Sequence, residues 1–195
     1  MKPLGPIVRL QIQRDRLKQG ERPRRWYDPA ALLSVPRLHL GPRGAVAEVD
    51  GFSALDVHHM DHPRSRFNLE TENTLTLGFT GHYAAMRDRF GPRLTDGIAG
   101  ENVIVDVDRT VGLDELAGGV LVRGQDGREL RFHRLNVAHP CAEFSHYALD
   151  LPPTTADAAV LKETLQFLDA GRRGFHMTFA DGPRWIDVGD EVFAL

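Results

Sequence analysis

The sequence contains one cysteine among 195 residues, which excludes an internal disulfide. Long hydrophobic runs are also missing: the longest apolar stretches, such as residues 30–33, are far shorter than the about 20 residues of a membrane-spanning helix. The N-terminus lacks the apolar core and small-residue cleavage site of a signal peptide. These absences predict a cytoplasmic protein with no membrane partner, in agreement with an unpaired thiol.

An excess of positive charge is absent as well. Lysine and arginine number 24 against 27 aspartates and glutamates, and the net charge is −3. Proteins that bind nucleic acids concentrate positive charge on one face, so we expect no nucleic-acid partner. The remaining composition, 42% hydrophobic and 26% charged, is typical of a globular protein and predicts one domain over residues 1–195.

Alternation of apolar and polar residues predicts several short strands. At residues 8–13, Val8, Leu10 and Ile12 alternate with arginine and glutamine, which is the period of a half-buried strand. Further strands are predicted at residues 45–49, 102–107, 119–122, 128–137 and 175–179. After a turn at 181–182, residues 185–193 are predicted to complete a terminal hairpin. Residues 14–29 are basic and contain turn formers; we interpret them as a long exposed loop, a solvated connection in preference to an anion-binding arm.

Helical spacing is confined to two segments. The first runs from Thr80, as N-cap, through Phe90, with Gly91 as the stop signal. The second has apolar residues at three- and four-residue spacing over 160–168, and Gly171 ends it. Many short strands with only two helices predict a mainly β fold: an antiparallel β-barrel with a few appended short helices.

Cys141 is the first candidate for chemistry. It follows His139-Pro140, and the proline removes a backbone donor and favours an extended His139, so Cys141 is expected at a strand end or in a loop. A cysteine that acts as nucleophile, sulfur carrier or soft-metal ligand needs a partly exposed site near cations. The alternative is an inert core cysteine.

Two glycine-containing segments could bind a ligand. Gly97 and Gly100 precede Glu101 and Asn102 before a predicted strand; glycine lets a backbone approach a ligand, and an asparagine amide can bond a pterin or a phosphate. The alternative is an ordinary turn into a strand. Arg173, between the second helix and the next strand, could clamp a phosphate or cap the helix C-terminus.

Histidines gather in the polar segment 56–66. His58, His59 and His62 lack the spacing of a preformed tetrahedral metal site, and we interpret them as loop residues. Arg66 could bind an anion or be a solvated loop charge.

Taken together, these segments resemble the MOSC domain, a family related to the C-terminal part of molybdenum cofactor sulfurases and also found in the amidoxime-reducing component. Members of this family show four motifs in a fixed order. They are Gly-x-x-Gly-Glu-Asn (here 97–102), Pro-Cys (140–141) with a following aromatic residue (Phe144), Arg-Gly-aromatic (173–175) and Gly-Asp (189–190). The order matches across roughly residues 45–195.

The resemblance implies a MOSC-type barrel whose pocket holds the molybdenum cofactor, molybdopterin. Cys141 would be a thiolate ligand of molybdenum or would carry sulfur as a persulfide. The implied cofactor contacts are Gly100, Glu101, Asn102, Arg66, Arg173 and His139. Pyridoxal phosphate belongs to longer sulfurases whose desulfurase part is not in this sequence, so none is expected here.

Three functions remain open from the sequence. The first is a small molybdoenzyme that reduces N-hydroxylated compounds; because the sequence has no iron–sulfur cysteine cluster and no dinucleotide glycine fingerprint, it would need a separate electron-donor protein. The second is a sulfur carrier supplied by a cysteine desulfurase. The third is a non-catalytic barrel binding module, favoured by Leu55 and Ala138 where family members carry glycine and a basic residue.

Overall fold

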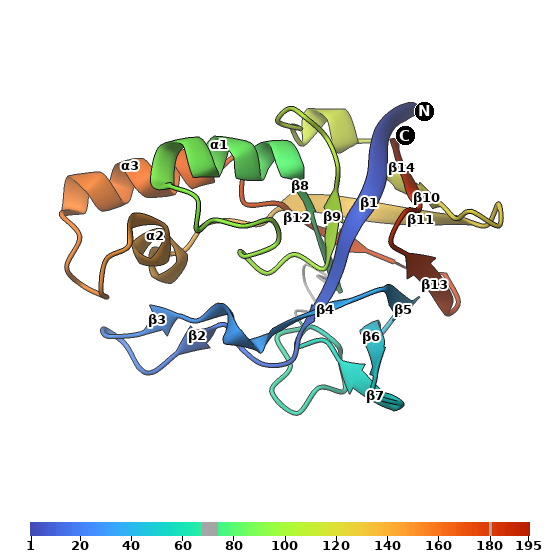
Figure 1. The fold of residues 1–195 in the computed structure, drawn as a ribbon, viewed down its shortest axis with the longest axis horizontal. Helices are drawn as coiled ribbons and strands as arrows, with labels where there is room; N and C mark the ends of the chain where they lie inside the picture. Colours follow the sequence, from blue (N-terminus) through green and yellow to red (C-terminus); the bar gives the residue numbers. More distant parts are fainter. Residues whose placement is uncertain (68–73, 180) are drawn as a thin grey trace.

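A closed barrel forms the centre of the computed structural model, which describes residues 1–67, 74–179 and 181–195 (Figure 1). Its strands pair in the order β14-β10-β11-β12-β8-β9-β1, and β1 pairs with β14 to close the ring. The strands are β1 (Lys2–Gln13), β8 (Leu75–Phe79), β9 (Val103–Val105), β10 (Val120–Arg123), β11 (Glu129–Val137), β12 (Phe175–Thr178) and β14 (Glu191–Ala194). The predicted β-barrel is confirmed.

The barrel is antiparallel except between β8 and β9, which run parallel. Parallel neighbours need a crossover, and here it contains the helix α1 (Thr80–Phe90). α1 has the predicted bounds and stops at Gly91, whose φ is +101°. Thr80 is not its N-cap: the Thr80 hydroxyl instead donates to Asp106 and accepts from the Val107 N–H. The helix is thus tied to the end of β9.

A smaller sheet lies beside the barrel. Its order is β13-β5-β6-β7, and a further strand, β4, pairs with β1. These strands are β4 (Leu32–Val35), β5 (Arg37–Gly41), β6 (Gly44–Val49), β7 (Phe52–Leu55) and β13 (Arg184–Asp187). The predicted terminal hairpin is wrong, because β13 pairs with β5 while β14 pairs with β10 and β1. Gly189, at φ +93°, redirects the chain between the two sheets.

Three helices gather on one side of the barrel (Figure 1). Besides α1, these are α2 (Ala142–Leu149) and α3 (Ala158–Leu168), and short 3-10 turns occur at Pro29–Ala31 and Asp114–Leu116. α3 follows the predicted apolar spacing, and Asp157 caps it by accepting from the Ala159 N–H. α2, directly after Cys141, was not predicted. No helix in the described ranges is long and apolar enough to cross a membrane.

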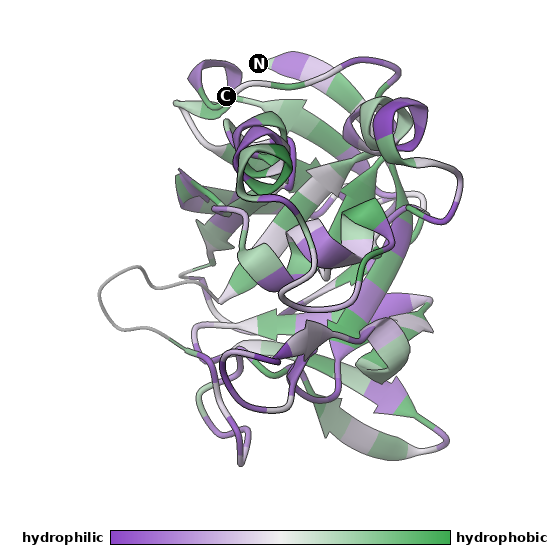
Figure 2. Ribbon diagram, turned by 90° about the vertical axis from the view of Figure 1, so that its left-hand side faces the viewer, coloured by the Kyte–Doolittle hydropathy of each residue, from purple (hydrophilic) through white to green (hydrophobic). Residues whose placement is uncertain are grey.

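Two hydrophobic clusters hold these parts together. One fills the barrel and continues under the small sheet, and it includes Phe79, Phe132 and Phe175. The other joins α1, α2 and α3 and includes Tyr83 and Phe144. Figure 2 shows the corresponding distribution of hydrophobic residues on the barrel strands and hydrophilic residues on many of the connecting loops.

Residues 14–29, called the arm below, are not simply an exposed loop. They contain a two-stranded ribbon, β2 (Lys18–Gln19) with β3 (Trp26–Tyr27). Leu17 and Tyr27 are buried in the helix-side cluster, and the Tyr27 ring packs 5.0 Å from that of Phe144. Both residues therefore anchor the arm over the side of the barrel that carries the helices.

Candidate functional site

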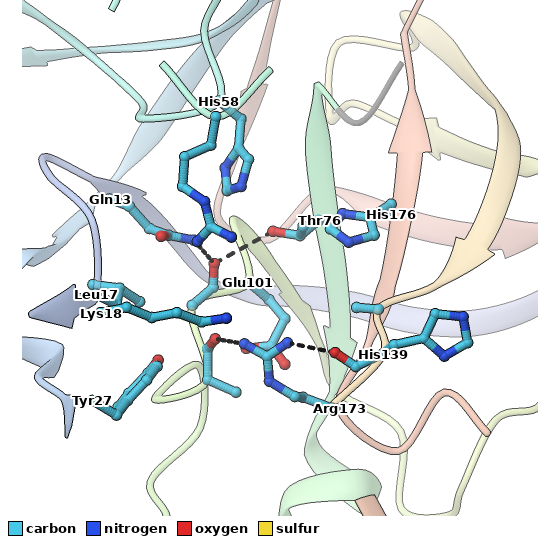
Figure 3. Close-up of a pocket in the computed structure, with 14 residues that line it drawn as sticks. Gln13, Leu17, Lys18, Tyr27, His58, Thr76, Glu101, His139, Arg173 and His176 are labelled. Atoms are coloured by element: carbon cyan, nitrogen blue, oxygen red, sulfur yellow. Dashed lines mark hydrogen bonds between the residues drawn. The ribbon is translucent and has the colours of Figure 1, made fainter. Parts of the chain in front are cut away.

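A cavity opens between the arm, the loop 56–66, the segment 97–101 and strand β12 (Figure 3). Its walls come from distant parts of the sequence that the barrel and the arm bring together. The lining residues are Gln13, Leu17, Lys18, Tyr27, His58, Arg66, Thr76, Ala99, Gly100, Glu101, Ala138, His139, Arg173 and His176.

The segment 97–101 is held in place by two buried glutamines of β1. Gln11 donates to the carbonyls of Gly97 and Glu101, both at 2.7 Å, and Gln13 donates to that of Gly100 at 2.7 Å. A side chain at Gly100, where φ is +103°, would meet Gln13 at 2.8 Å. The polar face of the first strand is therefore buried at these two positions, and its amides position the wall of the cavity.

Asn102 does not line the cavity, because its amide serves the protein interior. It is fully buried; its oxygen accepts from the N–H and the hydroxyl of Thr76, and its nitrogen donates to Asp56 at 2.9 Å. We therefore correct the expectation of a direct ligand contact. Asn102 instead orients Asp56, which in turn accepts from the His58 ring at 3.0 Å.

Two histidines meet inside the cavity. The rings of His58 and His176 lie 6.5 Å apart, edge to face. Nδ1 of His58 donates to the Asp56 carboxylate, so Nε2 of His58 takes no part in that hydrogen bond. Burial, followed by the charges of His58 and Arg173, lowers the pKa of His176 to about 4, so His176 is neutral at pH 7.

Arg173 and Glu101 form the floor of the site (Figure 3). Arg173 donates to the carbonyls of Ala99 at 3.0 Å and His139 at 3.4 Å. Burial lowers the pKa of Arg173, but Cys141, Tyr27 and Glu101 outweigh it and raise the pKa overall. Burial raises the pKa of Glu101, against the hydroxyl of Tyr83 and the charge of Arg173. Glu101 is the one carboxylate among the described lining residues.

Cys141 lies beside the cavity and not in its described lining. It is partly buried, precedes α2, and its carbonyl accepts from the Ser145 N–H at 3.0 Å. Its thiol is close enough to raise the pKa of Arg173. The predicted position after a strand end and near a cation is found, since β11 ends at Val137 and the Arg173 guanidinium interacts electrostatically with Cys141.

The structure brings together most of the predicted cofactor contacts. Arg66, Gly100, Glu101, His139 and Arg173 all line the cavity. The sequence interpretation missed Gln13, Lys18, Tyr27, Thr76 and His176. Their signal was weak, because each is an ordinary member of a strand or of a basic loop until the fold places it here. No group of three or more His, Cys, Asp or Glu residues suited to a metal ion is found in the described ranges.

Gly174, next to Arg173, is expected to tolerate no side chain. Its φ is +95° and an added Cβ would lie 2.6 Å from the Leu77 carbonyl, whereas Gly127, at φ +82°, has open space around it. The left-handed backbone costs roughly 1–2 kcal/mol in either alanine variant. Overpacking adds about 1–3 kcal/mol for Gly174→Ala alone. Urea unfolding of both variants measures the difference, and equal losses of stability would contradict the close packing.

Comparison with known proteins gives a shared fold. No family model and no curated protein matches the chain. Among solved structures, the YUAD protein from Bacillus subtilis is similar with a TM-score of 0.55 and 13% identity, over 96% of this chain and 93% of that one. A structure described as a hypothetical protein is similar with a TM-score of 0.54 and 13% identity, over 97% and 67% of the two chains. The chain therefore shares its fold with these proteins.

Proposed function

We propose that the cavity binds the molybdenum cofactor, with Cys141 at its metal end. The observation that carries this proposal is a set of buried polar atoms on lining residues, none of which has a hydrogen-bond partner among the described residues. They are Oε1 of Gln13, Oε1 of Glu101, Nε of Arg173 and Nδ1 of His176. Each unsatisfied buried group costs about 1–3 kcal/mol, so a polar ligand that satisfies them would bind favourably.

The chemistry of these groups fits a pterin that carries a phosphate. A pterin presents an amino group and ring N–H donors, for which the oxygens of Gln13 and Glu101 are acceptors. The phosphate would meet Arg173, since an arginine fork binds two phosphate oxygens, and Lys18 and Arg66 also line the cavity. Both parts of such a ligand therefore have matching residues in the cavity.

Cys141 supplies the soft donor that this proposal needs. A thiolate suits a soft metal site, and Cys141 is partly exposed beside the cavity. When bound, molybdenum would supply the two-electron chemistry for reducing N-hydroxylated compounds. The residues of this chain would hold and orient the cofactor, and a separate protein would donate electrons.

A sulfur carrier is the second candidate, favoured by the position of Cys141 outside the lining of the cavity. In this function the Cys141 thiolate attacks the outer sulfur of a persulfide on a cysteine desulfurase. A new S–S bond forms on Cys141, and the desulfurase cysteine leaves as a thiolate.

Metal and pterin analysis of the purified protein tests the leading proposal. Protein from a host with active cofactor synthesis is expected to contain molybdenum and pterin in equal amounts, approaching one of each per chain. The matched control is the same protein from a host that cannot make the cofactor, which should contain neither. A molybdenum- and pterin-free protein from the competent host would reject the proposal.

A further inference from the structure

A second hollow adjoins the cavity on the side of the arm. It is lined by Arg16, Lys18, Gln19, Gly20, Arg25, Arg64 and Arg66. Five of these residues are cationic and none is acidic. Lys18 and Arg66 line the cavity as well, so the two sites are continuous.

Nearby carboxylates neutralise only part of this charge. Arg64 pairs with Asp15 at 2.6 Å, and Glu143 accepts from Arg25 at 2.6 Å and lies 3.6 Å from Lys18. Five cations with two carboxylates leave an excess of three positive charges.

Two of the arginines are available for a ligand. The side chain of Arg66 has no hydrogen bond or ion pair within the part of the chain that the structure describes, and Arg16 contributes only a 3.3 Å bond to the Arg64 carbonyl. Partial burial of the guanidinium, followed by the positive charge of Arg173, lowers the pKa of Arg66. Like charges held this close repel one another, and an anion between them would relieve that repulsion.

We infer that this hollow is an anion subsite that takes a diphosphate group of a ligand whose other end lies in the cavity. Three unbalanced cations, two of them arginines, match two linked phosphates better than one, because each guanidinium can bind two oxygens. In this inference the arm contributes to binding the diphosphate group. This subsite does not depend on molybdenum, so it can fail or hold independently of the proposed function.

Inorganic pyrophosphate is the probe for this subsite. Calorimetric titration of the full chain, purified from a host without cofactor synthesis, is expected to show one binding site that weakens with added salt. Arg16→Gln with Arg64→Gln should weaken binding roughly tenfold or more, since each charge-assisted hydrogen bond contributes about 1.5–3 kcal/mol. Neither residue lines the cavity.

Two further variants sharpen the test. Asp15→Asn frees Arg64 from its carboxylate and should tighten pyrophosphate binding several-fold. Arg131→Gln, an exposed residue of β11 outside both linings, should leave binding unchanged. No pyrophosphate binding, or equal binding by the Arg16/Arg64 double variant and Arg131→Gln, would overturn the inference.

The source of the diphosphate is separated by repeating the titration on cofactor-loaded protein. Retained pyrophosphate binding would assign the hollow to a phosphorylated substrate. Loss of binding, with a nucleotide released on denaturation, would assign it to a nucleotide-extended cofactor. Loss of binding without a released nucleotide would contradict a separate diphosphate subsite, because the cofactor's own single phosphate would then occupy it.

Discussion

Asp56→Ala is expected to lower the free energy of unfolding by about 3–5 kcal/mol, as for the loss of one partner of a buried ion pair. Asp56 is fully buried and accepts from the backbone N–H groups of Gln13 and His58, both at 2.8 Å, from the His58 ring and from Asn102. Alanine would leave all four donors without this acceptor, which is costly in a buried site. Urea unfolding followed by circular dichroism measures the loss.

The matched control is Asp61→Ala in the same loop. Asp61 is exposed and pairs with Arg43 at the surface, so its loss should cost less than about 1 kcal/mol. Similar losses in both variants would contradict the structural role of Asp56.

The same carboxylate gives a pH dependence. Burial raises the pKa of Asp56, but its hydrogen bonds and His58 outweigh burial, so the pKa is lowered overall. A lowered folded-state pKa contributes stability above the unfolded-state value, about 4, and that contribution is lost as the pH falls through the folded-state value. Asp56→Ala should therefore differ most from the wild type near neutral pH and converge with it in acid.

Cys141→Ser is expected to lower the molybdenum content of the purified protein by more than roughly tenfold. Even residues that only orient a metal ligand contribute about 10–100-fold to affinity, and a direct ligand contributes at least as much. Because Cys141 is partly exposed and serine is similar in shape, unfolding stability should change by less than about 1 kcal/mol. Pterin should be retained better than molybdenum, since Arg173 and Glu101 remain.

Three outcomes separate the functions of Cys141. Loss of molybdenum in the serine variant supports ligation. Unchanged molybdenum, together with a wild-type protein that gains the mass of one sulfur atom from a cysteine desulfurase and loses it to reductant, supports the sulfur carrier. A Cys141→Ser protein with unchanged ligand content and a wild type that accepts no sulfur would leave the barrel as a binding module without thiol chemistry.

Local patterns predicted local structure well in this chain. The bounds of α1 were predicted because apolar spacing ends at a glycine that adopts φ +101°. α2 was missed because it has only eight residues and begins directly after Pro140-Cys141, where the pattern had suggested a loop. Short helices of this kind depend on tertiary packing, here of Phe144 against Tyr27 of the arm.

The sequence did not predict the burial of polar residues whose partners lie far away along the chain. Alternation correctly marked residues 8–13 as a strand but could not show that Gln11 and Gln13 would be buried, because their carbonyl partners lie near residue 100. Part of the motif at 97–102 lines the cavity, yet the position of Asn102 depends on Asp56, which is 46 positions away. The arm was predicted to be an exposed loop, and it forms a wall of the cavity through the packing of Leu17 and Tyr27.

Anomalous diffraction at the molybdenum edge, from crystals of protein produced in a cofactor-competent host, tests the central claim most directly. The account predicts one molybdenum peak at bonding distance from the Cys141 sulfur, with pterin density in the cavity against Glu101 and Arg173. A molybdenum peak elsewhere on the protein, or crystals of the competent-host protein with no molybdenum at all, would contradict it.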